Sequence, residues 1–157
     1  MGVSGAGKTL IGRALARRLG WPFLDGDDFH PASNVDKMRG GTPLEPGDRV
    51  AWLDAILVAL TTVQRTGGHA VLACSALRHD FREALREDLS AVRFVYLKAD
   101  RELVRGRISA RTDHFMPASL VDSQFATLDE PNDALVIDAS KTPEAIVEEI
   151  ERELSVG

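Results

Sequence analysis

The residues best suited to chemistry stand at the start of the chain. Residues 2–9 read Gly2-Val3-Ser4-Gly5-Ala6-Gly7-Lys8-Thr9 and fit the pattern G-x-x-x-x-G-K-[ST] at every fixed position. Glycines let a backbone curl so that successive N–H groups point at phosphate oxygens. The lysine adds a positive charge for the β- and γ-phosphates, and the threonine hydroxyl can bind Mg²⁺. We predict a nucleoside triphosphate site here; a chance glycine-rich turn is the alternative.

A pair of carboxylates, Asp25 and Asp27, follows a short apolar stretch at 22–24. In open α/β sheets, ligands bind at the carboxyl ends of the strands, the same edge that carries a phosphate-binding loop. One carboxylate can hold Mg²⁺ through water, while the other accepts the proton of an attacking hydroxyl. A plain Asp/Gly turn is the alternative. We favour a functional pair, with Thr9 as a further candidate metal ligand, and the residues alone leave open which aspartate takes which role.

The polar, Gly/Pro-rich segment at about 30–47 is too long for a simple connector, so we predict a substrate-binding subregion. His30, Lys37, Asp48 and Arg49 lie in or beside it. A planar arginine fork suits a carboxylate, which makes Arg49 the candidate anchor for an acidic substrate. An exposed helix-start charge explains Arg49 equally well, and a structural role explains His30 equally well.

Further candidates follow later strands and helices. Ser75 and Arg78 follow an apolar strand at 70–74 and could touch substrate or phosphate, whereas Cys74 is expected to pack in the core. Arg107, Arg111 and His114 lie at the end of one helix and in the loop beyond. A closing loop that brings an arginine would stabilise the transferring phosphoryl group and exclude water. The alternative is an exposed Arg-rich helix end; we favour function for Arg111 and leave Arg107 open.

Helical and strand patterns alternate, which predicts an α/β fold with a parallel sheet in one domain spanning 1–157. We expect strands at 22–24, 70–74, 94–97 and 134–137. Helices are expected at 10–19, from an Asp48 N-cap to about 66, at 78–89, from an Asp100 cap toward 111, and from a Thr142 cap with Pro143. A loop of this kind normally follows a buried strand, so we expect a missing segment before Met1; a sheet without its central strand is the alternative.

Composition excludes several classes of protein. The net charge of −5 argues against a nucleic-acid surface, and Arg13, Arg17 and Arg18 fit a solvated helix face. The sequence contains no bilayer-spanning run and no signal-peptide pattern, so we expect no membrane partner. The single cysteine cannot form an internal disulfide, which suits a cytoplasmic protein.

Together these residues resemble the gluconokinase family of small P-loop kinases, relatives of shikimate kinase. The matching residues run in order along nearly the whole chain: 2–9, Asp25 to Pro31, Asn34, Lys37-Met38, Pro43-Leu44, Asp48-Arg49, Trp52-Leu53, Cys74 to Leu77, Tyr96-Leu97, Arg111, His114-Phe115 and Ser123 to Phe125. The loop is shared by many enzymes, whereas the blocks at 25–31 and 74–77 are far more specific. One departure is Thr9-Leu10, where the family has Ser-Thr.

The resemblance implies a three-layer P-loop kinase fold with sheet order 2-3-1-4-5, the missing strand being number 1. It implies transfer of the γ-phosphoryl group of ATP to the terminal hydroxyl of D-gluconate. Asp25 would assist Mg²⁺, Asp27 would orient or deprotonate the hydroxyl, Arg49 would hold the carboxylate, and Arg111 would act from a lid at about 111–118. The family pattern also suggests a homodimer.

Two other functions stay open at this point. The chain could phosphorylate another small metabolite, such as shikimate or a nucleotide, on the same scaffold. It could also be an NTP-dependent switch without an acceptor substrate. A GTPase switch would normally carry an Asn-Lys-x-Asp motif for guanine, and the sequence contains none.

Overall fold

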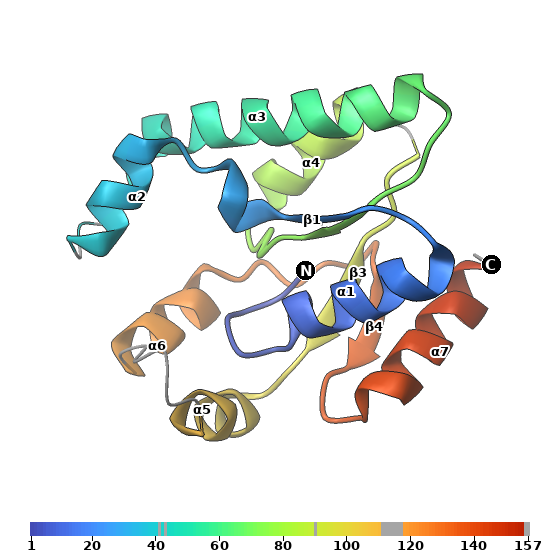
Figure 1. Cartoon of the computed structure of the whole chain (residues 1–157). Helices are drawn as coiled ribbons and strands as arrows, with labels where there is room; N and C mark the ends of the chain where they lie inside the picture. The colour runs from blue at the N-terminus through green and yellow to red at the C-terminus, as the bar shows by residue number, and fades with distance from the viewer. Residues whose placement is uncertain (41, 43, 90, 111–117, 156–157) are drawn as a thin grey trace.

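The computed structural model describes residues 1–40, 42, 44–89, 91–110 and 118–155. Its strands in these ranges are short and parallel and form two pairs. Strand β1 (Phe23–Asp25) pairs with β2 (Val71–Ala73), and β3 (Val95–Lys98) pairs with β4 (Leu135–Asp138). In Figure 1, helices α3 (Pro46–Arg65) and α4 (His79–Asp88) lie above β1, and α1 (Lys8–Leu19) lies below it. Parallel strands covered by helices confirm the predicted α/β class.

Met1 and Gly2 connect the two pairs of strands. The Met1 ammonium donates to the Val95 carbonyl at 2.5 Å, and the Met1 carbonyl accepts from the Leu97 amide at 3.0 Å. On the other side, the Gly2 amide donates to the Ser75 carbonyl at 3.1 Å. An apolar cavity of about 660 Å³ extends from Met1 along β2 and β3. The strand order 2-3-1-4-5 stays a prediction, and these two residues lie where it puts the end of strand 1.

The helix starts follow local signals, with one correction. Asp100 and Thr142 cap α5 (Arg101–Ser109) and α7 (Pro143–Leu154) through their side chains, as predicted. The N-cap of α3 is Glu45, so the prediction of an Asp48 cap was wrong. Pro46 occupies the first turn, which proline favours. Asp48 completes a capping box, because its carboxylate accepts from the Glu45 amide at 2.9 Å.

Three elements are additional to those predicted. A short 3₁₀ helix, η1 (Gly26–Phe29), directly follows β1, and α2 (Ala32–Arg39) occupies much of the segment at 30–47. Helix α6 (Ala118–Thr127) lies beside α5 in Figure 1. None of the helices in the described part of the chain combines the length and the apolar character that a bilayer crossing requires.

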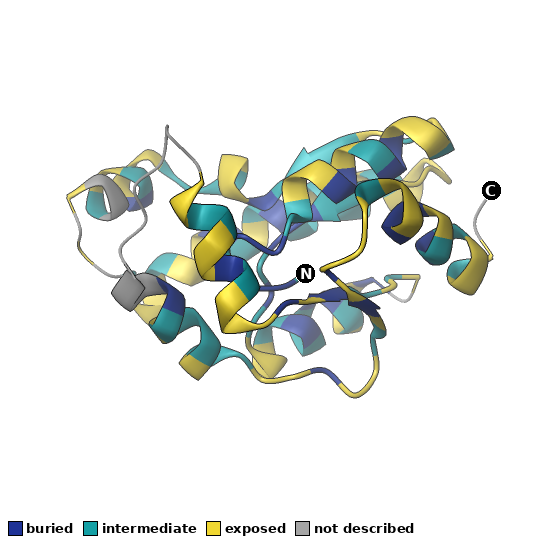
Figure 2. Ribbon diagram, turned by 90° about the horizontal axis from the view of Figure 1, so that it is seen from below, coloured by how far each residue is buried: buried dark blue, intermediate teal, exposed yellow. Residues whose placement is uncertain are grey.

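Two groups of buried side chains hold the layers together. One packs α1 and α7 against β3 and β4 and includes Ile11, Leu15 and Ile146. The other packs α3 against α4 and includes Ile56 and Leu85. Figure 2 shows buried positions alternating with exposed ones along the helices. Because both groups pack against strands, they hold the segments at the carboxyl ends of β1 and β2 beside residues 2–9.

Candidate active site

The loop at 2–9 has the backbone that its glycines predict. Gly5 and Gly7 have φ angles of +82° and +100°, in the left-handed region that favours glycine. Gly7 is also the N-cap of α1, so this helix starts directly at the loop and points its N-terminus there. Val3 and Ala6 are buried, and the Ala6 amide donates to the Val3 carbonyl at 3.2 Å. The loop is therefore anchored in the core by two side chains.

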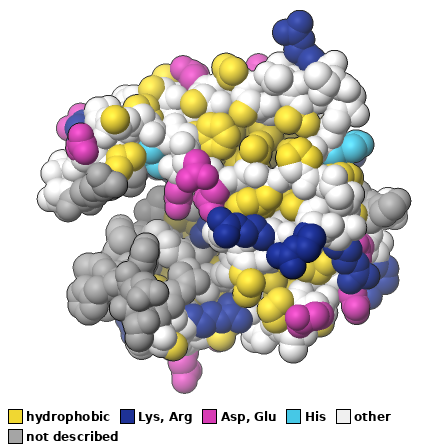
Figure 3. Space-filling view, viewed as in Figure 1, with side chains coloured by type: hydrophobic (Ala, Val, Ile, Leu, Met, Phe, Trp, Pro, Cys, Tyr) yellow, Lys and Arg dark blue, Asp and Glu magenta, His cyan; other side chains and the backbone are white. Residues whose placement is uncertain are grey.

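A cavity of about 280 Å³ brings the loop together with the predicted acidic pair. From the loop it is lined by Ser4, Gly5, Gly7, Lys8 and Thr9, and from the strand ends by Asp25, Asp27 and Ser75, with Leu10, Ala73, Cys74, Ile108 and Gln124 completing the wall. Figure 3 shows acidic side chains next to a row of Lys and Arg side chains over α1. The cavity thus joins an anion-binding backbone to carboxylates.

Thr9, Asp25 and Asp27 form a short polar chain on one wall of the cavity. The Thr9 hydroxyl donates to Asp25 Oδ2 at 3.3 Å, and the Asp27 amide donates to Asp25 Oδ1 at 3.2 Å. Asp25 therefore caps η1, which leaves the exposed Asp27 carboxylate on the first turn of that helix. One hydroxyl and one carboxylate side by side are the hard oxygen ligands that Mg²⁺ prefers.

Two cations contact the backbone of the loop. Lys8 Nζ donates to the Val3 carbonyl at 3.1 Å. Arg107 reaches from α5 and donates to the carbonyls of Ala6 at 3.2 Å and Ala139 at 2.7 Å. Arg107 is thus placed against the loop, although it does not line the cavity.

The polar residues of the predicted substrate region lie outside the cavity lining. Lys37 Nζ and the Asp48 carboxylate pair at 2.7 Å, which raises the pKa of Lys37 and lowers the pKa of Asp48. Arg49 is exposed in the first turn of α3, and Arg78 pairs with Asp80 at 2.8 Å. Arg111 and His114 lie outside the described residues.

Comparison with known proteins decides the family. The shikimate kinase family model matches residues 4–155. The gluconokinase of Gluconobacter oxydans (strain 621H) is 43% identical over 155 residues, covering 97% of this chain and 87% of that protein. The chain belongs to the gluconokinase family. The thermoresistant gluconokinase of Escherichia coli (strain K12) is 40% identical to this family member over 151 residues, covering 94% of this chain and 86% of that protein.

A solved structure supports the same assignment. The crystal structure of a gluconokinase from Sinorhizobium meliloti 1021 matches with a TM-score of 0.88 at 38% identity, covering 99% of this chain and 89% of that chain. The P-loop kinase fold expected from the resemblance is therefore confirmed, together with the family itself.

In this gluconokinase-family chain, Trp52 of α3 supports the acidic wall of the cavity. Its indole N–H donates to the Gly26 carbonyl at 2.7 Å, and its ring stacks on His30 and on Phe81 with centroids 4.8 and 5.0 Å away. Burial lowers the pKa of His30, while the nearby Asp27 charge acts in the opposite direction. Sequence reasoning assigned no role to Trp52, because its partner lies 26 positions away.

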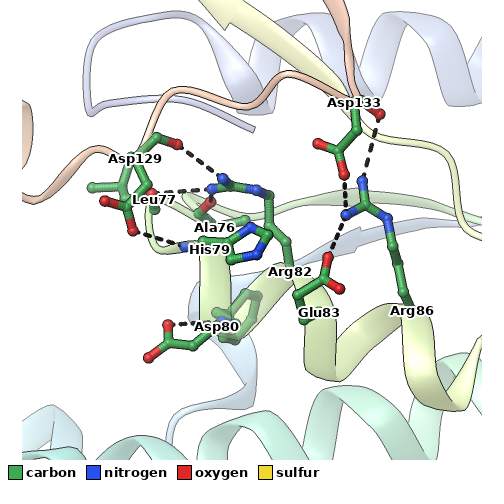
Figure 4. A network of polar contacts seen from close by, with 10 residues as sticks. Ala76, Leu77, His79, Asp80, Arg82, Glu83, Arg86, Asp129 and Asp133 are labelled. Carbon is green, nitrogen blue, oxygen red and sulfur yellow. Dashed lines mark hydrogen bonds and ion pairs between the residues drawn. The ribbon is translucent and has the colours of Figure 1, made fainter.

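Arg82 is a second residue of this family member that sequence reasoning missed. Its buried guanidinium donates to the carbonyls of Ala76 at 2.9 Å, Leu77 at 3.1 Å and Asp129 at 2.9 Å (Figure 4). It thereby ties the segment after β2 to the segment after α6. The available signal was its helical spacing, since Arg82, Leu85 and Leu89 share one face. Cys74 nearby is buried as predicted, and burial raises the pKa of its thiol to about 11.

Proposed function

We propose that the protein transfers the γ-phosphoryl group of ATP to the terminal hydroxyl of D-gluconate, giving 6-phospho-D-gluconate. The observation that carries this proposal is the single cavity lined by both the phosphate loop and the Asp25/Asp27 pair. Relatives named gluconokinase at about 40% identity over most of the chain support the choice of acceptor.

The residues of the cavity have separate roles in binding ATP, activating the hydroxyl and binding Mg²⁺. The loop amides and Lys8 hold the triphosphate, and Asp27 orients the acceptor hydroxyl and takes its proton. As the new phosphate ester bond forms, the bond between the γ-phosphorus and the β–γ bridging oxygen breaks and ADP leaves. Thr9 and Asp25 would hold Mg²⁺, which when bound neutralises charge on the phosphates. Two protein oxygens fit this ion, because Mg²⁺ at phosphate sites usually takes its other ligands from phosphate and water.

The remaining candidate residues are assigned to binding of gluconate and to a lid over the site. Arg49 holds the carboxylate of gluconate, with His30, Lys37, Asp48, Ser75, Arg78 and His114 as further contacts in the subregion at 30–47 and around it. Arg107 and Arg111 stabilise the transferring phosphoryl group, Arg111 from the lid at 111–118. We further propose a cytoplasmic homodimer that uses neither nucleic acid nor membrane.

The test is ADP release measured with gluconate, shikimate and nucleoside monophosphates as separate acceptors. We expect turnover with gluconate, and turnover only with shikimate or a nucleotide would reject the proposal in favour of another metabolite kinase. Asp27→Asn should lower kcat on the order of a hundredfold while ATP binding persists. The matched control is Asp28→Asn, the neighbouring exposed carboxylate on η1, which does not line the cavity and should retain wild-type kcat.

A further inference from the structure

Gln124 of α6 reaches across to the phosphate loop and bonds twice to one residue. The Ser4 amide donates to Gln124 Oε1 at 2.6 Å, and Gln124 Nε2 donates to Ser4 Oγ at 3.0 Å. A backbone N–H can only donate, so the amide oxygen has to face it, and the nitrogen then faces the hydroxyl. Both ends of the side-chain amide are used by a residue 120 positions away.

The Gln124 side chain forms part of the wall of the active-site cavity, and the proposed function gives it no role. Gln124 lines the cavity together with Ser4 and Lys8. Elsewhere along the loop, Val3 and Ala6 are buried, Lys8 Nζ contacts the Val3 carbonyl, and Arg107 contacts the Ala6 carbonyl. Gln124 is therefore the side chain that fixes the Ser4 end of the loop from outside.

Helix α6 is itself held on both sides, so Gln124 is presented from a firm support. Asp122 pairs with Arg101 at 2.7 Å and with Arg105 at 3.1 Å, both on α5. Just after the end of α6, the Asp129 amide donates to the Leu77 carbonyl at 2.9 Å. Helix α6 thus has contacts of its own with α5 and with the segment after β2 that do not involve the loop.

We propose that Gln124 is a positioning residue for ATP: it holds Ser4 so that the amides of residues 5–9 form their phosphate-binding cup before the nucleotide arrives. The inference deepens the proposed function and rests on it only in requiring that the loop binds ATP. A neutral amide suits this place, because a carboxylate would hold the Ser4 amide equally well but would put a negative charge beside the triphosphate.

The experiment is steady-state kinetics of Gln124→Leu and Gln124→Glu, with direct titration of a fluorescent ATP analogue in the absence of gluconate. We expect Gln124→Leu to raise the KM for ATP and the analogue Kd about tenfold, since a preorganised hydrogen bond is lost. The KM for gluconate should stay within about twofold of wild type because the acceptor contacts are intact. Gln124→Glu should weaken ATP binding further than the leucine variant does.

Two controls separate positioning from a general loss of structure. Gln64→Leu makes the same change on α3, outside the lining of the active-site cavity, and should leave both KM values unchanged. Ser4→Ala combined with Gln124→Leu should cost less than the sum of the single changes, because both remove the same bond. Unchanged or tighter ATP binding in Gln124→Leu, or equal losses for ATP and gluconate, would overturn the proposal. A wild-type protein that binds the analogue but does not phosphorylate gluconate would refute the proposed function instead.

Discussion

Trp52→Phe tests whether α3 holds the acidic wall in place. The change keeps an aromatic ring between His30 and Phe81 but removes the indole N–H that bonds to the Gly26 carbonyl at 2.7 Å. Gly26 is buried, so its carbonyl oxygen loses a partner that water cannot easily replace. Losing a hydrogen bond of this kind costs about 0.5–1.5 kcal/mol, and we expect the free energy of unfolding to fall by that amount.

The same change should affect catalysis, because Gly26 immediately precedes Asp27 and starts η1. A displacement of the reacting groups by about 1 Å can cost on the order of a hundredfold in rate, so we expect kcat with gluconate to fall at least about tenfold. ATP binding should change little, since the polar and ring contacts of Trp52 are with Gly26, His30 and Phe81 rather than with the loop at 2–9.

Urea unfolding and steady-state kinetics on the same preparations measure both effects. Trp21→Phe is the matched control: Trp21 stacks on His69 at 4.5 Å and does not line the active-site cavity. This control should keep the wild-type kcat. A Trp52→Phe protein with wild-type kcat and wild-type stability would refute the reasoning that the indole bond positions Asp27.

Three further substitutions test other contacts. Gly26→Ala would put a Cβ 3.0 Å from a carbonyl oxygen of β2, so we expect a loss of about 1–3 kcal/mol in urea unfolding together with a lower kcat. Asp48→Asn keeps the helix cap but loses the bond with Lys37 that lowers the pKa of Asp48 below 3.8. The wild type should therefore be the more stable protein at pH 7. Measured by thermal unfolding, the difference should begin to shrink as pH falls below about 4 and should vanish once the pH is below the lowered pKa of Asp48. Arg82→Met removes the side-chain donor of the Ala76 and Asp129 carbonyls, while the Leu77 carbonyl keeps the Asp129 amide as a donor, so the change should cost about 2 kcal/mol or more. Arg86→Met removes partly exposed ion pairs and should cost less than about 1 kcal/mol in the same assay.

The parts of the site that sequence predicts are those set by local chemistry. The glycine pattern predicts the curled loop because only glycine readily takes the φ angles of Gly5 and Gly7. Asp25 and Asp27 are brought to the loop because parallel strands end at one edge of the sheet. The caps at Asp100 and Thr142 follow from side-chain oxygens one turn before an apolar repeat.

What the sequence leaves open depends on contacts between distant segments. Nothing near Gln124 indicates that it bonds to Ser4, and nothing near Trp52 indicates a bond to Gly26. Asp48 is a plausible N-cap because it precedes an apolar repeat, yet α3 begins earlier in the chain, at Pro46. Helix α2 has few apolar residues, and its side chain Asn34 is fixed by the Asp48 carbonyl at 2.7 Å, a partner outside the helix.

Arg82 should make the contact between the segments after β2 and after α6 resistant to acid and to salt. Its hydrogen-bond partners are main-chain carbonyls, which neither gain protons in acid nor exchange partners for dissolved ions as carboxylates do. The joint between the end of β2 and the end of α6 should thus persist in mild acid or high salt, after the lysine–aspartate link between α2 and α3 has opened. Amide hydrogen exchange under such conditions would then reach the α2 corner first and the segment around Asp129 last.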